Sequence, residues 1–246
     1  MSVEDTPVRE DVMTAGAALR IYPDPADVFV ADQAELARHL HPLVSIDLAQ
    51  VNPAWHGWIH LLSPLEPSEG CIGDHTSAFH TGLQASNWLG FTLEGDRFRL
   101  AGDLRYFARA AGPGEVPDPW PGFHADLAEH CERQERSYRA HRDSFRREGR
   151  LVHLGDDGLP YPGSTGEMAL LDQLGGYADS AGNWIETDVF PLDYDGDRTW
   201  PVGPSGRRFE FVAAAPGWHY RSSGADWIML FFEPVDRLAL LTFDWS

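Results

Sequence analysis

The stretch WIMLFFEPVDRLALLTF, residues 227–243, decides the fold of this chain. It holds two apolar runs, Trp227–Phe232 and Leu238–Phe243, which are joined by the short turn Glu233–Asp236. Runs of this length that are nearly continuously apolar are typical of strands buried on both faces. We therefore expect these two strands to lie in the centre of a sheet, with other parts of the chain covering both faces.

Other strand candidates lie upstream. Gly95 lies at the centre of Glu94–Asp96, which is a typical hairpin turn. The segments with an apolar or alternating pattern are Val28–Val30, Leu43–Leu48, Gly57–Leu62, Asn87–Leu93, Arg97–Leu100 and Arg208–Val212. Because many of these strands follow one another closely, we expect mostly antiparallel pairing.

One long helix is predicted over about Gly122–Glu148, ended by Gly149. Its apolar stripe is Phe123, Leu127, Cys131, Tyr138 and Phe145. Acidic residues precede arginines by four positions at Glu129–Arg133, Glu132–Arg136, Glu135–Arg139 and Asp143–Arg147. We interpret the arginine cluster of this helix as a solvated, internally paired face and not as a nucleic-acid site.

Short helices are expected in three places. Asp32 and Glu35 form a capping box, Asp103 caps Leu104–Ala110, and Ser164 with Glu167 starts a helix that ends at Gly175-Gly176. The predicted fold class is α+β, mostly antiparallel sheet with one long charged helix and two or three short helices.

The predicted domain organisation is simple. Residues 1–20 have little periodicity and are expected to be a mobile tail, and residues 21–246 a single α+β domain. The segment 111–121 (AGPGEVPDPWP) is a candidate hinge because six of its eleven residues are Pro or Gly.

The charged residues of the chain exclude lysine-dependent catalysis and argue against nucleic-acid binding. The chain has nineteen arginines and no lysine, so a Schiff-base lysine or a phosphate-loop lysine is excluded. The formal net charge of −19 repels phosphate backbones, so no nucleic acid is expected as a partner. We predict a non-catalytic, immunity-like binding factor whose acidic surface binds a basic protein. Without a signal sequence or an apolar run long enough for a membrane, we expect a cytoplasmic protein with no membrane partner.

Three carboxylates alternate in Asp193-Tyr-Asp195-Gly-Asp197. Calcium prefers such dense oxygen ligands, although no glutamate closes the loop at the usual distance. Calcium or another divalent cation is therefore a candidate cofactor at Asp193, Asp195 and Asp197. A metal-assisted hydrolase is the corresponding alternative function.

Two tryptophans lie in expected loops that contain Pro and Gly: Trp200, which precedes Pro201, and Trp218, which follows Pro216-Gly217. Exposed tryptophans can stack on sugars or other small molecules, so a carbohydrate or small-molecule binder is the third alternative. Cys71 and Cys131 have no metal or redox spacing, and the sequence leaves their pairing open.

Two segments resemble the YwqG-like family of bacterial proteins. They are Leu174-Gly175-Gly176-Tyr177-Ala178-Asp179, followed by Trp184 and a late aromatic strand, and Leu43–Val51. The resemblance covers some 20–30 residues. It implies a β-rich single domain and indicates no reaction.

Overall fold

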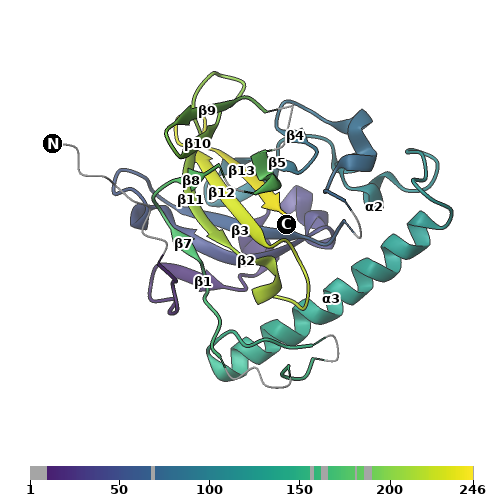
Figure 1. Cartoon of the computed structure of the whole chain (residues 1–246), viewed down its shortest axis with the longest axis horizontal. Coiled ribbons are helices and arrows are strands. Elements are labelled where there is room, and N and C mark those ends of the chain that lie inside the picture. Colours follow the sequence, from purple (N-terminus) through teal and green to yellow (C-terminus); the bar gives the residue numbers. More distant parts are fainter. Residues whose placement is uncertain are drawn as a thin grey trace.

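The computed structural model of the chain describes residues 10–67, 70–155, 158–161, 166–180, 182–185 and 190–245. Figure 1 shows sheets crossing in the body of the molecule, with the long helix α3 along one side. The α+β class with mostly antiparallel sheet, predicted from the sequence, is confirmed.

The two apolar runs form β12 (Trp227–Glu233) and β13 (Leu238–Asp244), paired antiparallel from Trp227↔Asp244 to Glu233↔Leu238. They lie in the middle of a seven-stranded sheet of order β4-β5-β13-β12-β11-β7, in which β6 also pairs with β5. The other strands are β4 (Gln84–Ala85), β5 (Trp88–Glu94), β6 (Arg97–Leu100), β7 (Gln173–Leu174) and β11 (Glu210–Ala215).

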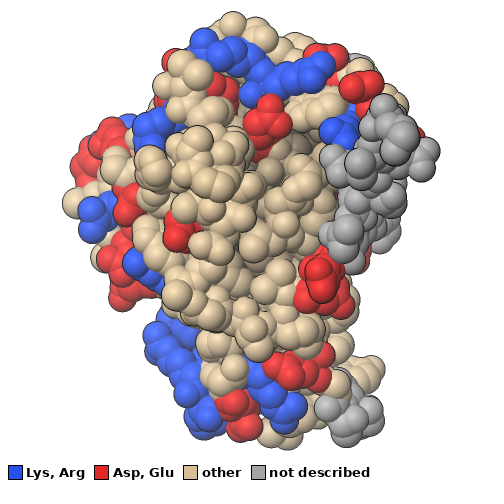
Figure 2. Space-filling model, turned by 90° about the vertical axis from the view of Figure 1, so that its left-hand side faces the viewer, with Lys and Arg blue, Asp and Glu red and all other residues tan. Residues whose placement is uncertain are grey.

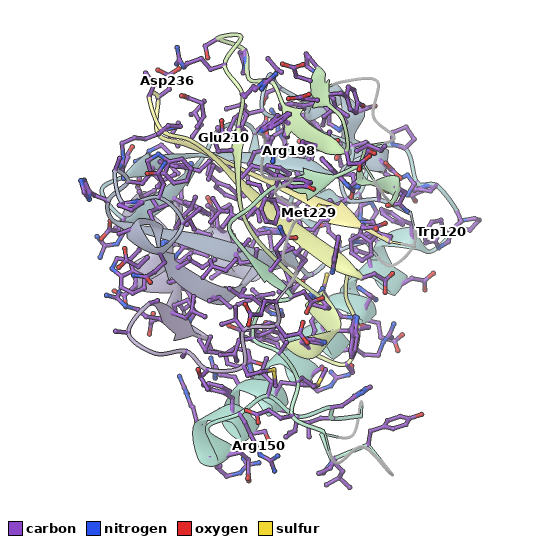
Figure 3. All side chains as sticks on the ribbon, turned by 60° about the vertical axis from the view of Figure 1, so that its left-hand side comes forward. Trp120, Arg150, Arg198, Glu210, Met229 and Asp236 are labelled. Carbon is purple, nitrogen blue, oxygen red and sulfur yellow. The ribbon has the colours of Figure 1, made fainter. Side chains whose placement is uncertain are left out.

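Both faces of the central strands are buried, as the apolar runs predict. Ile228 and Leu230 belong to the main core, whereas Met229 and Phe231 belong to a second core on the opposite face. Met229, on β12, lies in the middle of the molecule in Figure 3. Successive side chains of a strand point to opposite faces, so a run without polar residues supplies two cores at once.

A second sheet closes the main core. It consists of β1 (Leu19–Ile21), β2 (Leu40–Asp47) and β3 (Trp58–Pro64), paired antiparallel in that order. Its β3 strand lies against β12 and β13.

The opposite face is covered by a third, small sheet and the segment around it. That sheet has the order β8-β10-β9, with β8 (Ala178–Asp179), β9 (Leu192–Asp195) and β10 (Arg198–Pro201). Trp184, Phe190 and Phe209 complete the second core.

Helix α3 (Phe123–Glu148) confirms the long charged helix. Gly149 ends it with φ 71°, a left-handed conformation that glycine adopts without strain. The Glu129–Arg133 and Glu135–Arg139 pairs form at 2.9 and 2.7 Å. Asp143, however, approaches Arg146 and Arg142. Exposed pairs of this kind contribute roughly 0.2–0.5 kcal/mol each.

Shorter helical turns connect the sheets. They are α1 (Pro25–Val28), η1 (Ala31–Arg38), η2 (Leu48–Gln50), η3 (Asp74–Phe79), η4 (Leu104–Tyr106), α2 (Ala108–Ala111), η5 (Asn183–Ile185) and η6 (Gly217–His219). The candidate hinge links α2 to α3. Ala108 and Phe123, on either side of it, pack in the same apolar cluster with Leu65.

Three local predictions are wrong. Asp32 does not cap a helix: it lies inside η1, whose N-cap residue Val30 makes no side-chain cap hydrogen bond. The strand expected at Val28–Val30 does not form, since Val28 is the last residue of helix α1, which Pro25 opens and in which Asp24 accepts the Ala26 N–H at 2.9 Å. Phe29 makes an isolated bridge with Phe98. The helix expected to end at Gly175-Gly176 is replaced by strand β7, whose Leu174 pairs with Ala213 of β11. Pairing with the sheet thus overrides the local capping pattern. Ser164, the expected start of that helix, lies outside the described residues.

Part of the predicted tail is built into the fold. Residues 1–9 lie outside the described residues. Val12 forms a bridge with Leu171, with its N–H donating to the Leu171 carbonyl at 2.8 Å, and Leu19 already belongs to β1.

Candidate anion-binding site beside helix α3

The three aspartates predicted to bind a cation lie on the β9–β10 hairpin. Asp193 is paired with Arg208, at 2.6 Å between its Oδ2 and the guanidinium NH2, whereas Asp195 and Asp197 are exposed. Among the residues that the structure describes, no three His, Cys, Asp or Glu side chains come together as a group that could hold a metal ion. The structure therefore does not assemble these carboxylates into a site.

The two tryptophans predicted to bind a ligand differ in exposure. Trp200 lies within β10 and not in a loop, and only 8% of it is exposed. Its indole N–H donates to Glu210 at 3.2 Å, and the Arg208 guanidinium covers its ring. Trp218, on η6, is half-buried against His219 and His153. Trp200 thus offers no open stacking surface.

Cys71 and Cys131 are not joined by a disulfide. Cys131 is buried against α2, and burial raises the pKa of its thiol to about 11. At neutral pH this thiol is protonated and is a poor nucleophile.

The charge on one face of the molecule is mixed. Figure 2 shows acidic and arginine side chains interspersed around the edges of this face, with an uncharged centre. The excess of acid is therefore not gathered there, and binding of a basic protein stays a prediction. None of the helices in the described ranges combines the length and apolar character needed to cross a bilayer.

The most unusual polar group is Arg221, which lies between η6 and β12. Only 2% of this residue is exposed. Its loop is fixed by two glycines in close contact: a Cβ on Gly217 would lie 3.0 Å from the Ala225 nitrogen, and one on Gly224 would lie 3.0 Å from the Gly217 carbonyl carbon. The turn therefore needs glycine at both positions, and it directs Arg221 into the interior.

Arg221 is held by neutral acceptors. Its Nε donates to the Ser223 carbonyl at 2.7 Å and its NH2 to the Pro64 carbonyl at 2.6 Å, while NH1 lies 3.3 Å from His41 Nδ1. No carboxylate forms an ion pair with it in the described part of the chain. Burial lowers its pKa to about 10, so the guanidinium remains charged at neutral pH.

His41 links Arg221 to helix α3. Because Nδ1 accepts from Arg221, the ring carries its proton on Nε2, which donates to Glu135 at 2.8 Å. Burial lowers the pKa of His41 to about 4, so this bridge is a neutral imidazole. Hydrogen bonding from His41 lowers the pKa of Glu135 to about 2, with a further contribution from Arg139.

A cavity of about 290 Å³ opens beside Arg221. It is lined by Pro67, Gly70, His130, Gln134, Arg221, Ser223, Gly224 and Trp245. We call it the Arg221 cavity. Gln134 donates through Nε2 to the Ser223 hydroxyl at 2.6 Å, whereas its buried Oε1 has no hydrogen-bond partner among the described residues. The cavity thus combines the buried guanidinium of Arg221, the hydrogen-bond acceptor Oε1 of Gln134 and the aromatic side chain of Trp245.

This site has no signature in the sequence. His41 is 94 residues from Glu135 and 180 residues from Arg221 along the chain, so no spacing pattern connects the three. The one local signal is an arginine in Tyr220-Arg-Ser-Ser-Gly224, a polar segment just before the most apolar strand.

Comparison with known proteins gives no relative. No family model, no curated protein and no solved structure matches this chain. The resemblance to the YwqG-like family therefore stays a prediction.

Proposed function

We propose that this protein is a binding protein for a small organic anion, which it holds in the Arg221 cavity. The observation that supports this most strongly is a fully buried guanidinium that lines a cavity and has no carboxylate partner among the described residues. Burying a charge is costly unless an opposite charge or good hydrogen bonds compensate it. An anionic ligand would supply the missing charge.

The hydrogen-bond donors of Arg221 support an acidic group in particular. A guanidinium has five N–H groups, and three of them are used by Ser223, Pro64 and His41. The remaining two match the paired oxygens of a carboxylate. The cavity volume of about 290 Å³ suits a small molecule and not a polymer.

Gln134 further restricts the class of ligand that fits the Arg221 cavity. Its unpartnered Oε1 accepts a hydrogen bond, so a ligand that carries an O–H or N–H beside its carboxylate would satisfy both sides of the cavity. We therefore expect a hydroxy acid or amino acid to bind better than a simple acid. Trp245 would pack against the apolar part of the ligand.

Thermal unfolding with three small probes tests the proposal. Glycolate should raise the unfolding temperature more than acetate at equal millimolar concentration, and ethanolamine, which has no acid group, should not raise it. The Arg221→Lys variant keeps the charge but loses the planar fork, and it should lose most of the protection by both acids.

Gln134→Met should remove only the advantage of glycolate over acetate. Arg133→Met serves as the matched control, because Arg133 lies on the same helix but does not line the cavity. If neither acid protects the wild type, or if Arg221→Lys responds as Arg133→Met does, the proposal is wrong.

A further inference from the structure

A second cavity lies on another side of α3, between this helix, the end of η1 and the short helix α2. Its volume is about 380 Å³. Arg38 comes from η1 and Arg109 from α2. The remaining charged residues of its lining come from α3: Glu132, Glu135, Arg136 and Arg139. We call it the four-arginine cavity.

The charge of this cavity is opposite to that of the protein. Four arginines and two glutamates line it, which gives a local formal charge of +2 (4 − 2), in a chain whose net charge is −19. Local surplus charge of one sign in a concave site attracts ions of the other sign.

Two of the four arginines are already neutralised within α3. Arg139 pairs with Glu135 at 2.7 Å, and Arg136 approaches Glu132 at 3.9 Å. These pairs follow the i,i+4 geometry of the helix, so they hold both side chains along its surface.

The other two arginines carry the surplus charge. Arg109 donates from NH1 to the backbone carbonyl of Arg38 at 2.9 Å, which ties α2 to the end of η1 and brings both side chains to one cavity. Neither Arg38 nor Arg109 forms an ion pair with a carboxylate in the described ranges. Neither charge is therefore neutralised by an ion pair there, although Arg109 partly offsets the burial that raises the pKa of the Glu66 carboxyl.

We propose that the four-arginine cavity binds a dianionic phosphate group. A phosphate dianion matches the local charge of +2, and guanidinium groups arriving from η1 and α2 can bind different oxygens of a tetrahedral anion. The cavity is larger than a phosphate ion alone, so the phosphate would be carried by a small molecule such as a phosphate monoester. This site shares no lining residue with the Arg221 cavity, and the inference does not rest on the proposed function.

Calorimetric titration at low ionic strength tests the inference. The probes are inorganic phosphate and glycerol phosphate, which separate recognition of the free ion from recognition of an ester. We expect both to bind the wild type, with glycerol phosphate the tighter of the two. Raising the salt concentration should weaken binding, since charges at a surface cavity are screened.

Two variants locate the site. The double variant Arg38→Gln/Arg109→Gln should bind glycerol phosphate about tenfold more weakly or worse, because two charge-assisted contacts are lost. Arg133→Gln is the matched control: it removes an arginine of the same helix that pairs with Glu129 outside the cavity, and it should bind within about twofold of the wild type.

Folding of each variant is checked by thermal unfolding, and the single variant Arg38→Gln, at an exposed position, serves if the double variant is unstable. The inference is overturned if neither probe binds the wild type. It is also overturned if the double variant and Arg133→Gln bind equally, which would show diffuse attraction to the helix. Arg221→Lys should keep phosphate binding, so failure of the Arg221 proposal would leave this result interpretable.

Discussion

The imidazole of His41 lies flat on the ring of Tyr138, with ring centroids 4.0 Å apart and planes inclined by 9°. This stack holds the ring between Arg221 on one side and Glu135 on the other. Tyr138 itself is fixed by its hydroxyl, which donates to the Pro42 carbonyl at 2.6 Å. One aromatic contact thus orients the link between the sheet and α3.

Substitution of Tyr138 should separate the stack from the hydrogen bond. Tyr138→Phe keeps the ring and loses the hydroxyl, so we expect a loss of about 1 kcal/mol in the free energy of unfolding. Tyr138→Leu also loses the stack and part of the packing, and should cost roughly 2–4 kcal/mol. Urea unfolding measures both. Equal losses would mean that the stack contributes nothing.

Acid should destabilise the protein between pH 6.5 and pH 4. Burial lowers the pKa of His39, His41 and His60 to about 4. In this range the unfolded chain binds protons that the folded protein does not, so stability falls as pH falls, by roughly 1.4 kcal/mol per pH unit for each histidine. Urea unfolding at several pH values measures the slope. A flat profile would contradict the burial of neutral histidines.

The titration of Glu66 should oppose the loss of stability that the buried histidines cause as pH falls. Burial raises the pKa of its carboxyl to about 7, so the folded protein keeps a proton that the unfolded chain has lost above pH 4.5. Its contribution to stability is present below pH 4.5 and disappears as pH rises through about 7. Glu66→Gln removes this term, and its unfolding free energy should therefore depend more steeply on pH between 4.5 and 7 than that of the wild type. An unchanged slope would show that Glu66 titrates normally.

Glu135→Gln should weaken the link between α3 and the sheet at neutral pH, since Glu135 accepts hydrogen bonds from both His41 and Arg139. Its pKa is lowered to about 2, so its ionised form stabilises the fold above pH 4.5 and this contribution is lost as pH falls toward 2. The difference in stability between wild type and variant should therefore shrink over that interval. A constant difference would point to packing and not to charge.

Removal of divalent cations should leave the protein unchanged. Asp193 is already paired with Arg208, and the described residues offer no group of three metal ligands. We expect the same unfolding temperature with calcium and with EDTA, measured by calorimetry. A fall in EDTA, abolished by Asp195→Ala, would restore the cation site that the sequence suggests.

The sequence predicted the central features of the fold because they are local. The apolar runs on either side of Glu233–Asp236 require burial on both faces, and the i,i+4 acid–arginine pattern requires a helix, whatever the rest of the chain does. Trp200 was placed in a loop from its proline neighbour, yet it lies in β10, the middle strand of the small sheet. Pro201 is the last residue of that strand, beyond the two positions at which β8 pairs with it, so proline is tolerated there.

The two candidate sites could not be predicted for a different reason. Arg221 becomes unusual only when the Pro64 and Ser223 carbonyls and His41 surround it, and Pro64 and His41 come from distant parts of the chain. Arg38 and Arg109 become neighbours only because α2 packs beside the end of η1. Burial and convergence of side chains are properties of the folded chain, and residue spacing does not report them.

The strands that border the seven-stranded sheet are short: β7, of two residues, lies on one side, and β4 and β6, of two and four residues, both pair with β5 on the other. Unpaired backbone groups on a long edge strand can pair with strands of other molecules. Edge strands as short as these leave few backbone groups for such pairing. The most apolar segment of the chain, residues 227–243, thus pairs only within its own sheet, and concentrated solutions of the folded protein should resist fibril formation.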